Sequence, residues 1–289
     1  MDAPTTPGHG GSTPYPFSKH LPTPALGSVP PAPRPGPPSR ILRCANVPIH
    51  TCPPVEAARQ VLSLATSRLD RGADIHLCNA YTIALADRDP GLATLLKEAT
   101  ANFPDGKSVV WANRWLHRRQ SPPKTDRVYG PDLFLDVFAL GEPIELRHYL
   151  VGGTPQVLVD LQDRLRERFP SATIVGAESP PFRTPTDNER RAQVARIRDA
   201  DAQIVWLGLG TPKQDREAAW LASQLPVAVV AVGAAFDFVS GNKPQASPWI
   251  QDSGLEWLFR LCSEPRRLWR RYLFGNARFL RCVVAQAIR

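Results

Sequence analysis

The sequence predicts an α/β fold with a parallel β-sheet that helices cover on both faces. Between residues 148 and 232, four short apolar segments alternate with segments long enough for helices, an order of elements that forms a parallel sheet. The short segments are continuous runs of Val, Ile and Leu, as expected of strands buried on both faces. Glycine turns follow three of the four. Together these observations predict a Rossmann-like sheet.

The first elements come before residue 148. Apolar residues at helical spacing predict a helix over 55–69, and the apolar segment 74–79 predicts a short strand that ends in a polar residue. A proline in the first turn marks the start of a helix over 89–99. The segment 103–106 contains Pro-Asp-Gly and is interpreted as a turn after a helix.

From residue 148 onward, strands and helices alternate regularly. The predicted strands cover 149–151, 173–176, 203–207 and 227–232. The predicted helices cover 155–169, 187–200 and 212–225. Because each connection is long enough to hold a helix, neighbouring strands can run in the same direction.

The chain divides into three parts. Residues 1–40 hold twelve of the 31 prolines, with Gly, Ser and Thr between them, so we expect a disordered Pro-rich tail. Residues 41–253 are expected to form the α/β domain, and residues 254–289 a basic helical appendage. Residues 260–289 contain eight arginines and one acid, Glu264, so they carry +7 of the formal net charge of +8.

The appendage is also aromatic and amphipathic. On a helical wheel from Pro265, apolar residues and arginines fall on opposite sides, and Gly275-Asn276 marks a point where the helix can break in two. The apolar side holds Leu268, Trp269, Tyr272, Leu273, Phe279, Leu280, Val283 and Val284. This pattern is typical of a helix on an anionic membrane surface. A packed helix with a solvated basic face is the alternative, and nucleic acid is a third choice.

The remaining composition limits the class of protein. The five cysteines show no CxxC pair and no repeated spacing, which argues against a zinc site and a disulfide framework and favours a reducing compartment. The sequence has no run of eighteen apolar residues that would predict a spanning helix. The N-terminal residues lack the apolar core of a secretory signal. We therefore expect a cytoplasmic protein.

Glycine loops follow three of the predicted strands, at 152–154, 208–214 and 233–237. In a parallel sheet, ligands bind outside the carboxyl ends of the strands. Glycines allow close approach of the backbone, and helix N-termini attract phosphate. A nucleotide or pyrophosphate is therefore the expected ligand. The loops match neither a P-loop nor a dinucleotide fingerprint, so an ATPase and a dehydrogenase are disfavoured.

Few polar side chains stand out as catalytic or metal-binding. Asp105 lies in a Pro-Asp-Gly string, where an aspartate serves either turn geometry or as a general base, and the residues alone favour the turn. The Asp-x-Asp strings at 87–89 and 199–201 are interpreted as helix capping and surface charge, so no metal site is expected. Three histidines of the globular part are interpreted as isolated: His76, His117 and His148.

Six motifs occur in an order that resembles one known family. They are Pro104-Asp105-Gly106, RVYGPD from Arg127, GLGTPKQ from Gly208, VGAAFD from Val232, LEWLFRL from Leu255 and EPRRLWRRY from Glu264. Over roughly residues 41–282 the chain resembles the WecG/TagA/CpsF glycosyltransferases of bacterial surface-polysaccharide assembly. The resemblance implies an inverting, metal-independent hexosyl or N-acetylhexosaminyl transfer without a cofactor. The donor would be a UDP-sugar and the acceptor a lipid-diphosphate-linked sugar at the inner face of the cell membrane.

The resemblance also implies roles for individual residues. Asp105 matches the proposed catalytic base of the family, Asn79 an active-site asparagine, and Gln214 a glutamine near the donor. Arg127 matches an arginine in the cleft. Family arginines near the C-terminus are thought to close over the diphosphate and contact the membrane; the nearest candidates here are Arg260, Arg267 and Arg270, followed by Arg266 and Arg271. The strand-end loops add the substrate-binding candidates Gly152, Gly153, Gly210, Lys213 and Asp237.

The sequence departs from the family pattern at three places. Leu77 stands where many members have threonine, Gln245-Ala246-Ser247 replaces Arg-Ala-Pro, and 179–182 replaces a Gly-Tyr-Phe region. The donor sugar, the acceptor and the oligomeric state, a homo-oligomer included, therefore stay open. The expected partners are the donor, the lipid-linked acceptor and an anionic membrane, without nucleic acid. The alternative function is a membrane-associated nucleotide-sugar-binding protein that lacks transferase activity.

Overall fold

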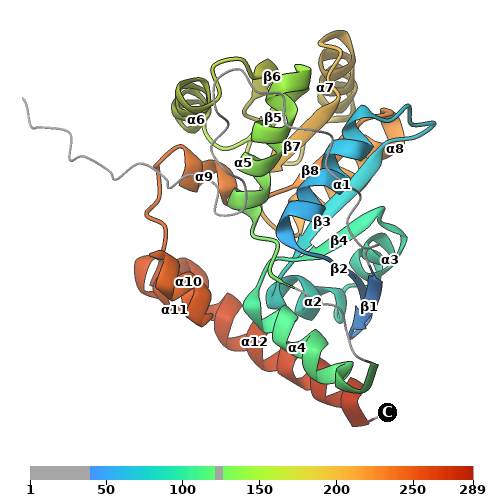
Figure 1. The fold of residues 1–289 in the computed structure, drawn as a ribbon, viewed down its shortest axis with the longest axis vertical. Helices are drawn as coiled ribbons and strands as arrows, with labels where there is room; N and C mark the ends of the chain where they lie inside the picture. The colour runs from blue at the N-terminus through green and yellow to red at the C-terminus, as the bar shows by residue number, and fades with distance from the viewer. Residues whose placement is uncertain (1–39, 121–125, 289) are drawn as a thin grey trace, which may run out of the picture.

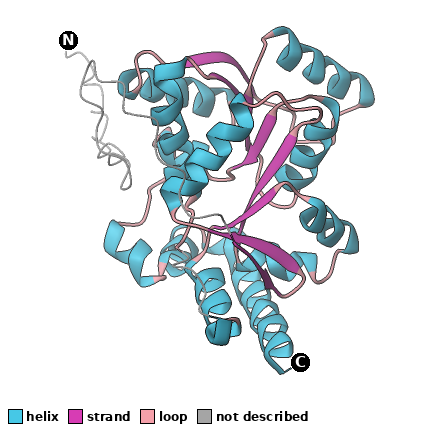
Figure 2. Cartoon of the chain, turned by 45° about the vertical axis from the view of Figure 1, so that its right-hand side comes forward, coloured by secondary structure: helices cyan, strands magenta, loops and turns pink. Residues whose placement is uncertain are grey.

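A computed structural model of the protein describes residues 40–120 and 126–288. Within these residues, six parallel strands form a sheet in the order β4-β3-β8-β7-β5-β6. Helices lie on both sides of this sheet (Figures 1 and 2), which confirms the predicted α/β class. The strands are β3 Ala73–Cys78, β4 Ala101–Pro104, β5 Arg147–Gly152, β6 Thr173–Glu178, β7 Ile204–Gly208 and β8 Ala228–Ala231.

The helices predicted from residue 148 to 232 are present within a few residues of their expected bounds, as is the helix predicted over 55–69. Helices α2, α4, α5, α9 and α10 were not predicted. The helices are α1 Pro54–Thr66, α2 Ala80–Ala86, α3 Pro90–Glu98, α4 Lys107–Leu116, α5 Gly130–Gly141, α6 Pro155–Arg168, α7 Asp187–Asp199, α8 Lys213–Gln224, α9 Ala235–Val239, α10 Pro248–Ser253, α11 Glu256–Ser263 and α12 Pro265–Ile288.

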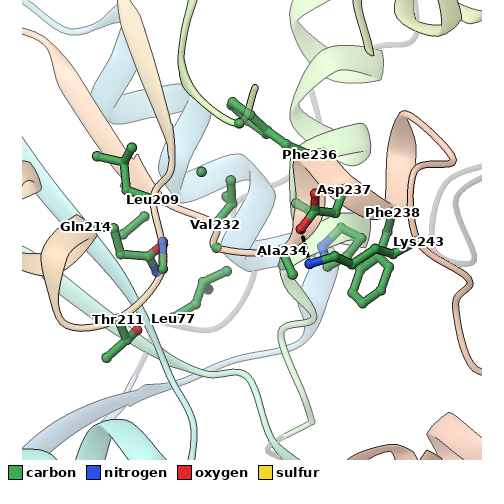
Figure 3. A pocket seen from close by; sticks show the side chains of 18 of the residues that line it. Leu77, Leu209, Thr211, Gln214, Val232, Ala234, Phe236, Asp237, Phe238 and Lys243 are labelled. Atoms are coloured by element: carbon green, nitrogen blue, oxygen red, sulfur yellow. Dashed lines mark hydrogen bonds and ion pairs between the residues drawn. The ribbon is translucent and has the colours of Figure 1, made fainter. Parts of the chain in front are cut away.

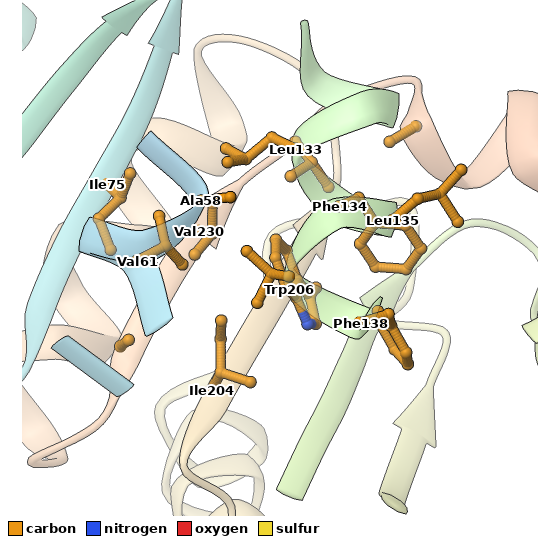
Figure 4. Packing of buried hydrophobic residues seen from close by; sticks show 14 of the residues in the cluster. Ala58, Val61, Ile75, Leu133, Phe134, Leu135, Phe138, Ile204, Trp206 and Val230 are labelled. Atoms are coloured by element: carbon orange, nitrogen blue, oxygen red, sulfur yellow. The ribbon is translucent and has the colours of Figure 1, made fainter. Parts of the chain in front are cut away.

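Successive residues of the central strands pack on opposite faces of the sheet. In β7, Ile204 and Trp206 join a buried cluster with α1, α5, α6 and α9, while Val205 and Leu207 join another with α7 and α8. The Trp206 ring meets Phe134 of α5 edge to face, with 4.9 Å between ring centres (Figure 4). Burial on both faces is the reason that the strand sequence is apolar throughout.

The first half of the segment predicted to be a turn, Phe103-Pro104, belongs to strand β4, so the expectation that Asp105 follows a helix is wrong. Pro104 ends a strand at the edge of the sheet, where a missing N–H removes no ladder bond. The backbone N–H of Asp105 then donates to the carbonyl of Cys78, at 3.0 Å. Asp105 therefore lies at the carboxyl end of the sheet, beside the end of β3.

The C-terminal helix α12 is part of the domain core. Phe279 and Val283 lie in a buried cluster with Ile83 of α2. The predicted break at Gly275 is wrong, because α12 is continuous over Pro265–Ile288. A Cβ at position 275 would lie 3.0 Å from Tyr81 Cδ2, so this glycine lets α12 approach α2 closely. Packing here outweighs the low helix propensity of glycine.

The apolar side of α12 consists of two adjacent stripes that differ in burial. One stripe is buried against the domain. The other, called the exposed stripe below, consists of Trp269, Leu273, Leu280 and Val284. Leu273 and Leu280 are 60% and 62% exposed. Among the described residues, no helix combines the length and the apolar character needed to cross a membrane.

Two additional strands, β1 Arg40–Cys44 and β2 Val47–Thr51, form an antiparallel hairpin beside the sheet. Gln286 of α12 binds this hairpin, since its Oε1 accepts from the N–H of Ala45 and its Nε2 donates to the carbonyl of Arg43. The two ends of the described chain are thus joined. The tail predicted over 1–40 lies outside the described residues, except that Arg40 begins β1.

Candidate active site

A cavity of about 500 Å³ lies where the carboxyl ends of the strands meet α11 and α12 (Figure 3). Its walls come from the segments that follow all six strands of the sheet, from the start of α5 and from both C-terminal helices. Four of the predicted candidates, Gly152, Arg127, Arg266 and Arg270, are not in its lining. The predicted residues that line it are Asn79, Asp105, Gly153, Gly210, Lys213, Gln214, Asp237, Arg260, Arg267 and Arg271.

Asp105 is a partly buried carboxyl at the edge of this cavity. Its Oδ1 accepts a hydrogen bond from the backbone N–H of Gly130, the first residue of α5, at 3.2 Å. Burial raises the pKa of Asp105, although the nearby Arg127 guanidinium and the Gly130 N–H act in the opposite direction. A carboxylate with a raised pKa is a better proton acceptor than one in water.

Asn79 connects the cavity to the start of α2. Its side-chain oxygen accepts from the backbone N–H groups of Tyr81 and Thr82, so it is the N-cap of that helix. Leu77, two residues earlier, also lines the cavity (Figure 3). Leu77, one of the three departures from the family pattern, is therefore in the site.

The loop after β7 is closed by the side chain of Gln214. Its Oε1 accepts from the backbone N–H of Gly210 at 2.9 Å, and Gln214 is 3% exposed. Gly210 has a φ of 77°, which favours glycine. Gly152 has a structural role instead, because a Cβ there would lie 2.7 Å from the Gly208 backbone in the adjacent strand.

Charged side chains link helix α9 and the loop that follows it to the C-terminal helices. Lys243 Nζ lies 2.9 Å from Asp237 Oδ2 (Figure 3) and 3.6 Å from Glu264 Oε1. Glu264 also pairs with Arg267, with 2.5 Å between Oε2 and Nε. Asp237 is thus neutralised by a cation, and neither Lys243 nor Glu264 was singled out from the sequence.

Three arginines line the cavity from the C-terminal side: Arg260, Arg267 and Arg271. The Arg271 guanidinium lies 4.3 Å from the centre of the Tyr81 ring. Burial lowers the pKa of Arg271, and its Nε has no hydrogen-bond partner in the part of the chain that the structure describes. A partly buried cation of this kind favours an anionic ligand.

The guanidinium of Arg127 is hydrogen-bonded to other groups of the protein. Its Nε donates to the carbonyl oxygen of Asp105 and its Nη2 to Glu256 Oε2, both at 2.5 Å. Tyr129 donates its hydroxyl to Glu256 Oε1 at 3.0 Å. Tyr129 and Glu256 line the cavity but were not chosen from the sequence, although both lie within the quoted motifs.

A smaller cavity of about 230 Å³ adjoins the first and shares Pro180, Pro181, Leu209 and Lys213 with it. Its lining includes the carboxylates of Glu178 and Glu217. Glu217 is 5% exposed, and its Oε1 has no hydrogen-bond partner among the described residues.

His76 is not isolated, contrary to the expectation from the sequence. In the interior its Nδ1 lies 3.1 Å from Asp215 Oδ1 and its Nε2 lies 3.1 Å from Asp74 Oδ2. Burial alone would lower the pKa of His76, but the two carboxylates raise it to about 9. The contact between His76 and Asp215 joins the first turn of α8, which carries Lys213 and Gln214, to the middle of β3.

We expect this cluster to make the free energy of unfolding decrease at alkaline pH. Because the folded-state pKa lies above the ordinary value of 6.5, the contribution is complete below pH 6.5 and is lost as the pH rises through about 9. The shift corresponds to about 3 kcal/mol of unfolding free energy. Urea unfolding followed by Trp fluorescence from pH 6 to 10 measures it. His76→Gln should remove most of this pH dependence, and an unchanged dependence in that variant would contradict the assignment.

The remaining predicted features are simple. Asp89 caps α3, accepting from the N–H of Leu92 at 3.0 Å, as expected. The five cysteines, all within the described residues, are free thiols. Among the described residues, no group of three or more His, Cys, Asp or Glu side chains is arranged to hold a metal ion.

The comparison with protein families agrees with this arrangement. The model of the glycosyl transferase WecG/TagA/CpsF family matches residues 42–289. The match covers the whole sheet, the cavity and both C-terminal helices. The chain therefore belongs to the WecG/TagA/CpsF family of glycosyl transferases, which act in surface-polysaccharide synthesis.

Proposed function

We propose that the protein transfers a hexosyl or N-acetylhexosaminyl group from a UDP-sugar to a lipid-diphosphate-linked saccharide, with inversion at the anomeric carbon. The observation that carries this proposal is the placement of one partly buried carboxyl, Asp105, and three arginines around a single cavity. The product would enter exopolysaccharide or other cell-surface polysaccharide synthesis.

The strand-end loops suit the donor nucleotide. Gly153 precedes α6 and Gly210 precedes α8, so the N-terminal ends of two helices, which attract phosphate, adjoin the cavity. The adjoining 230 Å³ cavity, with the carboxylates of Glu178 and Glu217, has acceptors for the hydroxyls of a ribose. We therefore place the diphosphate over these loops and the nucleoside toward the smaller cavity.

Asp105 acts as the general base. It takes the proton from the acceptor hydroxyl as the oxygen attacks the anomeric carbon, and the bond from that carbon to the UDP oxygen breaks on the opposite face. An α-linked donor then gives a β-linkage. The raised pKa of Asp105 favours this proton transfer.

The arginines stabilise the departing diphosphate. Arg260, Arg267 and Arg271 bring positive charge to the cavity from the side opposite the sheet. Fixed cations at the point where negative charge develops lower the barrier, a role that metal ions have in other transferases. Arg271 is the strongest candidate for a direct contact, because its Nε is buried and has no protein partner among the described residues.

The exposed stripe and its neighbouring arginines support membrane association. A surface helix with apolar residues beside Arg270 and Arg281 is suited to the interface of an anionic bilayer. We propose that the protein is peripheral on the inner face of the cell membrane. There the sugar of a lipid-linked acceptor could reach the cavity while its lipid stays in the bilayer.

A second candidate function is nucleotide-sugar binding without transfer. Leu77, which replaces a threonine found in many family members, lies in the cavity wall. Gln245, at another departure, donates to the Tyr129 hydroxyl at 3.0 Å.

The test is a donor screen in which UDP release is measured with a set of UDP-sugars, with and without lipid-diphosphate-linked saccharides. We expect release with one donor to depend on the lipid-linked acceptor. Saturable donor binding without acceptor-dependent release would favour the second function. Acceptor-dependent transfer from a sugar linked to a different nucleotide, assayed in parallel, would overturn the UDP assignment.

A further inference from the structure

One buried side chain, Glu256, ties helix α11 to the loop that carries Asp105. Its Oε2 accepts from Arg127 and its Oε1 accepts from the Tyr129 hydroxyl. Arg127 donates in turn to the carbonyl oxygen of Asp105. Glu256 is 9% exposed, so solvent screens these interactions weakly. The C-terminal helices are therefore joined to the proposed base through an acid as well as through the arginines that line the cavity.

Neighbouring groups fix the positions of Arg127 and Tyr129. The guanidinium carbon of Arg127 lies 3.9 Å from the centre of the Tyr129 ring, and Gln245 Nε2 donates to the Tyr129 hydroxyl at 3.0 Å. Both residues belong to the segment that leads into α5, whose first N–H binds Asp105. If α11 moved away, Arg127 and Tyr129 would lose their carboxylate partner and would stay beside Asp105.

The charges around Asp105 come from several elements. Burial raises the pKa of Asp105, Arg127 and Arg260 lower it, and Glu256 raises it. The titratable and charged groups that act on Asp105, or on which it acts, are Cys78, Arg127, Tyr129, Glu256, Arg260 and Tyr272. Glu256 is the acid among them that offsets Arg127, and it is also the partner that Arg127 binds directly.

We propose that Glu256 is a positioning residue that makes the basicity of Asp105 depend on the docking of α11. The proposal rests on the function of Asp105 proposed above. With α11 docked, Glu256 engages Arg127, and its negative charge keeps Asp105 a strong base. With α11 displaced, the charge of Arg127 acts on Asp105 without compensation and stabilises the carboxylate, which makes it a weaker base. Proton transfer to Asp105 is therefore efficient only when α11 is docked.

The main test replaces Glu256 with glutamine, which keeps the size of the side chain and removes its charge. We expect the acidic limb of the kcat–pH profile to move by roughly one unit to lower pH, because a like charge near Asp105 is lost. The plateau kcat should fall roughly three- to tenfold, while KM for the donor changes little. The matched control is Asp252→Asn, the same loss of charge at an exposed position of α10. It should leave the profile in place.

Two further variants separate charge from packing. Glu256→Asp retains the charge and should retain the position of the acidic limb. Arg127→Gln removes the opposing charge and should move the limb to higher pH, whereas the Arg127→Gln, Glu256→Gln double variant should return it toward that of the unmodified protein. A purely structural role would lower kcat or stability in all of these variants and leave the limb where it is.

A second measurement does not depend on turnover. The carboxyl carbon of Asp105 can be titrated by ¹³C NMR, with its signal identified by its loss in Asp105→Asn. The proposal is overturned if the Asp105 titration is the same with Glu256 and with glutamine there. If instead Asp105→Asn retains turnover, the proposed function of Asp105 fails, whatever the NMR titration shows. The two failures are therefore distinguishable.

Discussion

Replacement of Asp105 by asparagine is expected to lower kcat by about 10²–10⁴-fold, the usual contribution of a general base. Asparagine keeps the shape of the side chain and an oxygen that can accept from the Gly130 N–H. The fold and the affinity for the donor should therefore change little, which isothermal calorimetry with UDP and thermal unfolding can check. Asp105→Ala should have at least as large an effect on turnover.

Asp237 provides the matched comparison for this prediction. It is the other aspartate in the cavity lining, but Lys243 and Asn242 already bind its carboxylate. We expect Asp237→Asn to change kcat by less than about tenfold, because a carboxylate held in an ion pair is a poor proton acceptor. Near-normal turnover in Asp105→Asn, or equal losses in both variants, would remove Asp105 as the base.

The second large effect is expected on membrane binding. The double replacement Leu273→Glu and Leu280→Glu puts two acids into the exposed stripe. Each buried leucine contributes about 1.5–3 kcal/mol when it leaves water, so binding to vesicles should weaken by at least about 10²-fold. Co-sedimentation with vesicles rich in phosphatidylglycerol measures this effect, and activity on a water-soluble acceptor analogue should remain.

The control for this prediction is Val159→Glu on α6. Val159 is also exposed, at 51%, but Figure 1 shows α6 at the end of the molecule away from α12. Vesicle binding should be unaffected by this replacement and should decrease with added salt, since the arginines contribute through screened charge. Full binding by the double variant at high salt would show that the exposed stripe is not the membrane contact.

Point replacements are sharper here than removal of the C-terminal segment. Phe279 and Val283 of α12 belong to the same buried cluster as Ile83 and Leu92. A chain cut after Ser253 would lose these contacts, and its loss of activity or of membrane binding would reflect destabilisation as well.

Strands of the parallel sheet could be predicted where burial on both faces makes their sequence apolar throughout. Trp206 and Val205 lie side by side in the chain and are buried on opposite faces of β7, so the strand is apolar at every position. Strand β4 carries no such signal, because its last residue, Pro104, and the Asp105 that follows it are also typical of turns, and only the place of β4 at the sheet edge permits the proline. The predicted break at Gly275 was wrong for a related reason, because the close contact of this glycine with Tyr81 stabilises the helix there.

The loops that form the site could be predicted from the sequence, whereas most contacts between their side chains could not. Glycine loops and quoted motifs pointed to Asp105 and Gln214, which do line the cavity. The choice between Arg270 and Arg271 depends on the rotation of α12, which its packing on α2 sets. The cluster of His76 with Asp215 joins residues 139 positions apart, and no local pattern reports such a pairing.

The link between Gln286 and the β1–β2 hairpin has a consequence for synthesis of the protein on the ribosome. The sheet can begin to form while the chain is still being made, because residues 73–231 contain all of its strands. The cavity also needs residues 256–271, and the hairpin gains its last partner only when residue 286 emerges. A nascent chain therefore holds an open, incomplete site, and unfinished copies should be unable to consume donor sugar.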